Sequence, residues 1–265
     1  MRDECCEDPR PVIVENDPLS GQAIVVCEHA SHNIPNKYHG LGLPREMLLT
    51  HIGWDPGALD TARGLAARLD CPLVASGVSR LVVDCNRALD ARDLIPETSA
   101  GIAIPGNASL DEVSRQRRID EVHRPFHDRL DEILTARQAG GRATALVTVH
   151  SFTPVFAGRE RPWHAGLIQD RDERLIGPIE TALEGETGLT VGRNVPYSRA
   201  DGVLFTLAHH AERRGLASVM IEIRNDLLAS GGDRARWAER LSDALGPVLC
   251  DLGDAATVGE GGAGE

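Results

Sequence analysis

Short apolar runs alternate with amphipathic segments along this 265-residue chain, and this alternation limits the fold more than any other feature of the sequence. Continuous apolar runs predict buried strands, and longer amphipathic segments predict the helices that cover them. The predicted strands are "QAIVVC" (22–27), "PLVASGV" (72–78), "RLVVDCNR" (80–87), "TALVTVH" (144–150), "HAGLIQD" (164–170) and "ASVMIEIR" (217–224). Because strands that alternate with helices usually form a parallel sheet buried on both faces, the pattern predicts an α/β fold, a three-layer sandwich with a mainly parallel mixed sheet.

The helices predicted between these strands carry start signals. Asp55 is a candidate N-cap for a helix over 55–69, and Pro56 suits its first turn. Ser109 and Glu112 form a capping-box pattern before a long helix that reaches Ile133. Further helices are predicted near 171–187, 203–214 and 233–252.

The length and the distribution of apolar residues predict one α/β domain over residues 21–252. Residues 1–20 are polar and contain prolines, so we expect a loosely attached lead-in. Residues 253–265 consist mainly of Gly, Ala and Glu, which offer little apolar surface to bury. We therefore expect a disordered tail there.

Composition excludes several classes of protein. The formal net charge of −12 argues against nucleic acid as a partner, because phosphate binding requires a basic surface. No apolar run is long enough for a membrane span, and the first residues lack the apolar region of a signal peptide. The six cysteines contain no CxxC pair, which predicts reduced thiols and a cytoplasmic protein.

Polar side chains follow or end four of the predicted strands. The run "IVVC" is followed by Glu28 and His29, "LVVD" by Asn86 and Arg87, and "LVTV" by His150 and Ser151, while "VMIE" ends in Glu222 and leads to Arg224. Each residue alone has an ordinary explanation, such as a turn, a helix cap or the polar face of an edge strand. Ligands of open α/β sheets bind outside the carboxyl ends of the strands, so the joint placement predicts a site there.

Two histidines and a carboxylate are the ligands of a catalytic zinc that keeps one coordination position open. His29 and His150 can supply the imidazoles, and the remaining ligand is open between Asp55, Glu28 and His32. A separate carboxylate, for which Glu222 is the candidate, would transfer a proton from water to the leaving nitrogen. Arginines complete such a site: Arg80 can stabilise an oxyanion, and Arg87 can bind a substrate carboxylate.

Six motifs in this order resemble the N-formylglutamate amidohydrolase family over about Val25 to Leu228. They are "VCEHASHNIP", "HIGWDPGA", "SRLVVDCNR", "VTVHSF", "NVPYSRADG" and "IEIRNDLL". The resemblance implies a phosphorylase/hydrolase-like fold, akin to zinc carboxypeptidases and the aspartoacylase group. It also implies one Zn²⁺ per chain and hydrolysis of the amide of a small N-acyl amino acid with a free carboxylate, similar to N-formylglutamate.

The resemblance assigns a role to each residue that matches a family motif. It favours Asp55 as the third ligand beside His29 and His150, Glu222 as the general base and Arg80 as the arginine that polarises the carbonyl. It places Asn86, Arg87, Ser151, Tyr197 and Arg224 at the substrate. The sequence departs from the His-x-x-Glu pattern of the carboxypeptidases, because His32 occupies the glutamate position, and "CEHAS" indicates a divergent branch.

Two other functions fit the same residues. One is a zinc carboxypeptidase or deacylase with a larger substrate, and the other is a non-catalytic homologue that binds an acidic metabolite. We expect a small-molecule partner, no nucleic acid and no membrane, and we leave open self-association into a homo-oligomer.

Overall fold

A seven-stranded mixed sheet forms the centre of the computed structural model, which describes residues 8–17 and 20–260. The strand order is β1-β3-β2-β6-β11-β9-β10. The bounds are β1 Val12–Glu15, β2 Ala23–Cys27, β3 Leu73–Ser76, β6 Ala145–Phe152, β9 Ala165–Ile168, β10 Val191–Arg193 and β11 Ser218–Arg224. The four central strands β3, β2, β6 and β11 are parallel, whereas β1 and β9 are antiparallel to their neighbours β3 and β11. The predicted three-layer α/β fold with a mainly parallel mixed sheet is confirmed.

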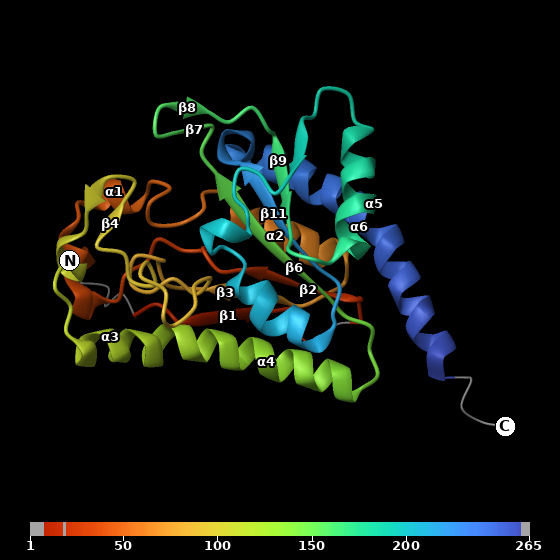
Figure 1. Ribbon diagram of the computed structural model, residues 1–265, viewed down its shortest axis with the longest axis horizontal. Helices are drawn as coiled ribbons and strands as arrows, with labels where there is room; N and C mark the ends of the chain where they lie inside the picture. Colours follow the sequence, from red (N-terminus) through yellow and green to blue (C-terminus); the bar gives the residue numbers. More distant parts are fainter. Residues whose placement is uncertain (1–7, 18–19, 261–265) are drawn as a thin grey trace, which may run out of the picture.

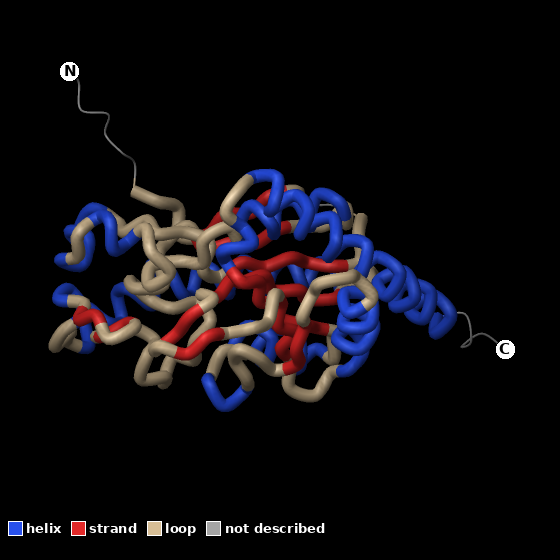
Figure 2. Tube along the Cα trace, turned by 90° about the horizontal axis from the view of Figure 1, so that it is seen from above, coloured by secondary structure: helices blue, strands red, loops and turns tan. Residues whose placement is uncertain are grey.

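Helices cover both faces of this sheet (Figures 1 and 2). Side chains alternate between the faces of a strand, so Val25 and Cys27 join one apolar core, and Ile24 and Val26 join the other. The first core is completed by α2 (Ala58–Arg68), α5 (Glu173–Glu184) and α6 (Gly231–Glu260). The second core is covered by the π-helical turn η3 (Ile119–His123) and α4 (Arg124–Ala139). Helix α3 (Glu112–Arg118) precedes them along the lower edge of Figure 1.

Short elements complete the fold. The small strands are β4 Thr98–Ser99, β5 Ile102–Ala103, β7 Val155–Phe156 and β8 Arg159–Glu160, and the short helices are η1 Asn36–Gly42, α1 Arg45–Leu48, η2 Pro105–Asn107, η4 Arg199–Asp201, η5 Leu207–Ala211, η6 Glu212–Arg214 and η7 Asn225–Leu228. The hairpin β7–β8 projects beside the end of β6 in Figure 1. None of the helices formed by residues 8–17 and 20–260 has the length and apolar character needed to cross a bilayer.

One predicted strand is wrong. Residues 81–86 are buried, but residues 80–87 form turns instead of a strand. Ser79 starts these turns, because its hydroxyl accepts a hydrogen bond from the amide of Leu81 (3.2 Å) and its carbonyl accepts one from Val82 (3.0 Å). The apolar side chains of this segment pack into the second core, so their burial comes from the helices above them and not from strand pairing.

The helix starts also differ from the sequence prediction. Helix α2 begins after Gly57, whose φ of 82° suits glycine, and the side chain of Asp55 does not cap it. Helix α3 is capped by Asp111, which accepts a hydrogen bond from the amide of Ser114 (2.7 Å), so the predicted capping box at Ser109 is wrong.

Both ends of the predicted domain contain more structure than expected. Strand β1 lies within the lead-in and pairs with β3, so residues 12–15 extend the sheet. Helix α6 continues to Glu260 and overlaps the segment in which we expected disorder. Positions 1–7, 18–19 and 261–265 lie outside the described residues.

Candidate metal centre

Three predicted ligands meet at one edge of the sheet. His150 is the sixth residue of β6, and His29 lies two residues after the neighbouring parallel strand β2. Asp55 reaches the same place because its amide donates a hydrogen bond to the carbonyl of His29 (2.9 Å), just before α2 begins. One ligand atom from each of His29, Asp55 and His150 lies within 4.8 Å of the other two, and all three side chains are buried.

Both imidazoles turn the same nitrogen toward Asp55. The Nδ1 atoms of His29 and His150 lie 3.3 Å and 2.9 Å from Asp55 Oδ2. The opposite nitrogens face two further carboxylates: His29 Nε2 is 2.7 Å from Asp84 Oδ1, and His150 Nε2 is 3.0 Å from Glu28 Oε2. Metal-binding histidines commonly donate their second ring N–H to a carboxylate in this way, which fixes the tautomer and leaves the first nitrogen for the metal.

The charges around the two imidazoles fit a bound cation. His29 Nδ1 is buried and has no hydrogen-bond partner among residues 8–17 and 20–260, although it points toward the centre of the cluster. Three buried carboxylates, those of Glu28, Asp55 and Asp84, contact these two imidazoles. Two imidazole nitrogens and one carboxylate oxygen, with one position left open, are the donors of a catalytic zinc site.

The ionisation of this cluster follows from its charges. Burial opposes the charged form of His150, but Glu28 and Asp55 outweigh burial and raise its pKa well above the usual value. Burial likewise opposes ionisation of Asp55, while Arg80 and His29 lower its pKa well below the usual range. The cluster is therefore a strongly negative set of donors that attracts positive charge, whether a proton or a metal ion.

The structure separates the three alternatives for the third ligand. Glu28 faces the far nitrogen of His150, on the opposite side of the ring from Asp55. The ring of His32 packs against Trp54, with 5.1 Å between the ring centroids, and does not line the cavity at the centre. Of the three candidates, only Asp55 shares a centre with both imidazoles.

A cavity of about 100 Å³ opens at this cluster and collects most of the predicted site residues. It is lined by His29, His51, Asp55, Arg80, Asn86, Arg87, His150, Ser151, Tyr197, Val203, Met220 and Glu222. Arg224 is not among these lining residues, because its guanidinium pairs with Asp226 (2.8 Å).

Glu222 has the properties of a general base. It pairs in register with His150 on the adjacent parallel strand, so its carboxylate lies beside the metal cluster. Its Oε2 atom is buried without a hydrogen-bond partner among the residues that the structure describes, and burial raises the pKa of Glu222 to about 7. A carboxyl group with a pKa near neutrality can both accept and return a proton at physiological pH.

Arg80 connects the candidate ligand to the open part of the cavity. Its Nη2 donates a hydrogen bond to Asp55 Oδ1, whereas its Nε is buried and has no hydrogen-bond partner in the described part of the chain. Arg80 therefore keeps one N–H group that no described residue uses.

Asn86 and Arg87 lie on one wall of the cavity and are held by backbone groups. Asn86 Nδ2 donates to the carbonyl of Val203 (2.6 Å), and its Oδ1 accepts from the amide of Thr206 (3.1 Å). Arg87 donates from Nε to Asp93 (2.7 Å) and from Nη1 to the carbonyl of Asn86 (3.1 Å). These contacts fix the direction of the guanidinium.

Ser151 and Tyr197 also reach the cavity. The Ser151 hydroxyl donates to the carbonyl of Pro56 (3.0 Å), and the Tyr197 hydroxyl accepts from Arg161 Nη1 (3.3 Å). The backbone just before Tyr197 packs closely against Gly166, where only glycine fits. A Cβ atom at Gly166 would lie 1.7 Å from the carbonyl oxygen of Val195, two residues before Tyr197.

Two residues of the site were missed in the sequence. Asp84 ends the run "LVVD", but only Asn86 and Arg87 are predicted as site residues at this place, and Asp84 contacts His29 directly. His51 opens the motif "HIGWDPGA" and lines the cavity, with its Nδ1 3.5 Å from Asp55 Oδ1. Burial and Arg80 lower the pKa of His51 to about 4, so its imidazole is neutral at pH 7.

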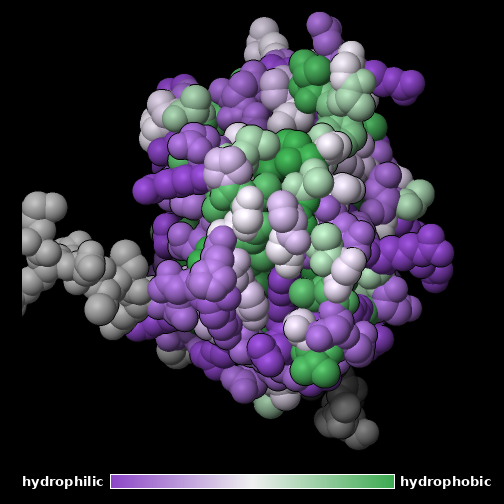
Figure 3. All heavy atoms as spheres, turned by 90° about the vertical axis from the view of Figure 1, so that its left-hand side faces the viewer, coloured by the Kyte–Doolittle hydropathy of each residue, from purple (hydrophilic) through white to green (hydrophobic). Residues whose placement is uncertain are grey.

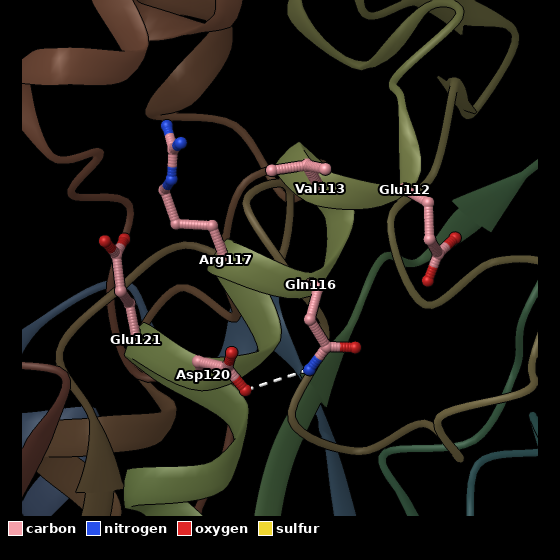
Figure 4. A pocket seen from close by; sticks show the side chains of 6 residues that line it. All are labelled: Glu112, Val113, Gln116, Arg117, Asp120 and Glu121. Carbon is pink, nitrogen blue, oxygen red and sulfur yellow. Dashed lines mark hydrogen bonds between the residues drawn. The ribbon is translucent and has the colours of Figure 1, made fainter.

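The cavity at the metal cluster is not the widest hollow of the described residues. A wider one of about 600 Å³ lies along α3 and η3 and is lined by six residues of these two elements only (Figure 4). Its one internal contact is a hydrogen bond from Gln116 to Asp120 (2.9 Å), at the surface of the helix. Polar side chains cover most of the molecular face seen in Figure 3, with apolar side chains gathered near its middle.

Comparisons with known proteins agree with this geometry. The family model for N-formylglutamate amidohydrolase matches residues 21–229. The crystal structure of gene product Atu2144 from Agrobacterium tumefaciens is 46% identical in sequence, and the match covers 91% of this chain and 95% of that one with a TM-score of 0.88. The crystal structure of N-formylglutamate amidohydrolase from Ralstonia eutropha JMP134 has the same fold at 22% identity, covering 94% of this chain and 99% of that one with a TM-score of 0.66. Among curated proteins, the comparison finds no significant match.

Proposed function

This chain belongs to the N-formylglutamate amidohydrolase family, a family of hydrolases, and from this premise we propose that it is a zinc-dependent amidohydrolase. Its substrate is a small N-acyl amino acid with a free carboxylate, similar to N-formylglutamate, and its products are the acyl acid and the amino acid. The observation that supports this proposal best is the cluster of His29, Asp55 and His150 with the unpaired carboxylate of Glu222 beside it.

In the proposed site, His29, His150 and Asp55 would hold one zinc ion through the two Nδ1 atoms and a carboxylate oxygen. Asp84 and Glu28 orient the two imidazoles from behind. When bound, zinc lowers the pKa of a coordinated water to about 7 and polarises a carbonyl oxygen.

The residues of the chain supply the remaining chemistry. Glu222 accepts a proton from water as the oxygen attacks the acyl carbon, and it delivers this proton to the amide nitrogen as the C–N bond breaks. The free Nε–H of Arg80 donates to the oxygen that gains negative charge. Arg87 and Asn86 bind the substrate carboxylate, with Tyr197 and Ser151 beside them.

The size of the cavity favours a small substrate. Sites for drug-sized ligands have volumes of roughly 300 Å³ or more, whereas this cavity measures about 100 Å³. A peptide or another large substrate would require a wider cleft at the same residues. We therefore prefer the N-acyl amino acid to the larger substrate of a carboxypeptidase.

We further propose a cytoplasmic location and no nucleic-acid or membrane partner. Four cysteines of the described chain, Cys27, Cys71, Cys85 and Cys250, are free thiols, as expected in a reducing compartment. The negative net charge disfavours binding to phosphate backbones.

The experiment that tests the proposal is a turnover screen of the zinc-loaded protein against N-acyl amino acids, with Glu222→Gln as the key variant. This variant keeps the shape of the side chain but cannot transfer the proton, so we expect turnover to fall by about 10²- to 10⁴-fold while zinc remains bound. The exposed Glu184→Gln serves as the control and should retain wild-type turnover. Wild-type activity in Glu222→Gln would exclude this base, and an inert wild type that a substrate stabilises thermally would favour a binding protein.

A further inference from the structure

A second group of histidines lies beside the candidate metal centre, on two π-helical turns. One turn, η3, ends at His123, one helical turn before His127 in α4, and the other, η5, carries His209 and His210. His123, His127 and His210 are buried, and neighbouring rings in the group have centroids 4.4–5.8 Å apart. Single π-helical turns are rare and occur frequently at functional sites.

Two of these histidines hold the wall of the cavity. His127 Nε2 lies 2.8 Å from the carbonyl oxygen of Cys85, and His123 Nε2 lies 3.0 Å from the carbonyl oxygen of Arg87. On the other side of its ring, His127 Nδ1 lies 2.9 Å from His210 Nε2. We call His123, His127 and His210 the histidine bridge.

The chemistry of the partners fixes the direction of these hydrogen bonds. A carbonyl oxygen can only accept, so His123 and His127 carry their protons on Nε2 and donate them to the backbone. The Nδ1 of neutral His127 is then an acceptor, and His210 Nε2 must donate to it. Burial lowers the pKa of His127 and lowers that of His210 to about 3, which agrees with three neutral imidazoles.

The segment held in this way carries three groups of the proposed site. Asp84 contacts His29, and the side chains of Asn86 and Arg87 line the cavity. Asn86 also bonds to the backbone of Val203 and of Thr206, immediately before the turn that carries His210. The bridge and Asn86 therefore connect the segment to both π-helical turns, so movement of either turn would displace it.

We propose that the histidine bridge positions residues 84–87, so that Arg87 and Asn86 meet the substrate carboxylate and Asp84 fixes the ring of His29. His127 is its central positioning residue, because it contacts both the backbone of the segment and His210. The consequences for substrate rest on the proposed amidohydrolase function. The hydrogen-bonded support of the segment does not depend on it.

The substitutions His127→Phe and His127→Gln separate positioning from packing. Phenylalanine keeps a ring of similar size and removes the donor to Cys85, whereas glutamine places an N–H group near the position of Nε2. His123→Phe removes only the bond to Arg87. His209→Phe is the matched control, because the ring of His209 lies in the same group with 5.8 Å to His127, while no hydrogen bond of its side chain is found among the described residues.

Three measurements are made on each zinc-loaded variant: KM and kcat for an N-acyl amino acid, amide hydrogen exchange of residues 84–87, and zinc affinity by competition with a chelator. We expect His127→Phe and His123→Phe to raise KM by about 10-fold or more with a smaller change in kcat. Exchange at residues 86 and 87 should accelerate, and zinc affinity should fall by about 10-fold in His127→Phe. His127→Gln should restore wild-type values, and His209→Phe should retain them.

The proposal is overturned if His127→Phe has wild-type exchange and KM, or if His127→Gln behaves like His127→Phe, which would assign a packing role to the ring. If the wild type hydrolyses no N-acyl amino acid, the proposed function fails. Exchange and zinc affinity then still decide the role of the bridge, since neither requires turnover.

Discussion

The candidate metal centre and the histidine bridge are built from the same residue type and have opposite electrostatics. In the metal centre each imidazole lies between two carboxylates, so the pKa of His150 is raised well above its usual value. In the bridge the imidazoles face carbonyl oxygens and one another, and the pKa values of His127 and His210 are lowered. The neighbours of a buried histidine therefore decide whether it attracts a cation or acts as a neutral donor.

This difference gives the two regions different tasks. Carboxylates behind His29 and His150 leave both Nδ1 atoms directed at a shared centre, where a divalent ion is the natural partner. In the histidine bridge, the ring N–H groups instead donate to the carbonyl oxygens of Cys85 and Arg87 and so fix a turn of the backbone. We infer that the first region carries out chemistry and the second maintains the shape of its wall.

The strongest test of the comparison makes the same substitution in both regions. His150→Gln removes a proposed zinc ligand, so we expect loss of bound zinc and of measurable turnover. His127→Gln preserves the donor to Cys85, so we expect zinc content and turnover close to those of the wild type. Both variants should fold, which circular dichroism checks, and equal effects of the two substitutions would contradict the division of tasks.

Asp84→Asn tests the carboxylates behind the imidazoles. The amide cannot replace the charge next to His29 Nε2, so we expect zinc affinity to fall by about 10- to 100-fold. Asp93→Asn is the control for zinc binding, because Asp93 contacts Arg87 and not an imidazole. Competition with a chelator measures the zinc affinity of both variants. An unchanged zinc affinity in Asp84→Asn would remove Asp84 from the metal centre.

Arg87→Ala tests the wall that the bridge supports. A hydrogen bond between charged groups contributes about 1.5–3 kcal/mol, so we expect KM to rise about 10- to 100-fold for substrates with a free carboxylate. An amidated analogue of the same substrate serves as the control, and the substitution should barely change its KM. Equal losses for both substrates would show that Arg87 does not bind the carboxylate.

The least direct effect is the pH dependence of stability caused by His210. Its pKa is about 3 in the folded chain and about 6.5 when unfolded, so between these values the unfolded state binds more protons. The contribution of neutral His210 is fully present above about pH 6.5 and is lost as the pH falls, by at most about 1.4 kcal/mol per pH unit. We expect the free energy of unfolding of His210→Gln, from urea titrations at about pH 6 and pH 4, to fall less steeply than that of the wild type. Parallel pH profiles would contradict a neutral buried His210.

The sequence predicts the sheet well because most of its strands are continuous apolar runs. Such runs contain β2, β3, β6, β9 and β11. It fails at residues 80–87, since a buried turn and a buried strand have the same apolar composition. His29, Asp55 and His150 could be proposed from their places after strands or before a helix and from the family motifs. The roles of Asp84 and the histidine bridge could not be proposed from the sequence. Asp84 contacts an imidazole far away in the chain, and the bridge contacts backbone carbonyl groups, and only folding brings these groups together.

The central claim is that His29, Asp55 and His150 hold a metal ion, and elemental analysis of the purified protein tests it most directly. We predict one equivalent of zinc in the wild type and in His127→Gln, and its loss in both His29→Ala and His150→Ala. A wild-type protein without metal after growth in zinc-supplemented medium, or a zinc content that neither alanine substitution changes, would contradict the claim.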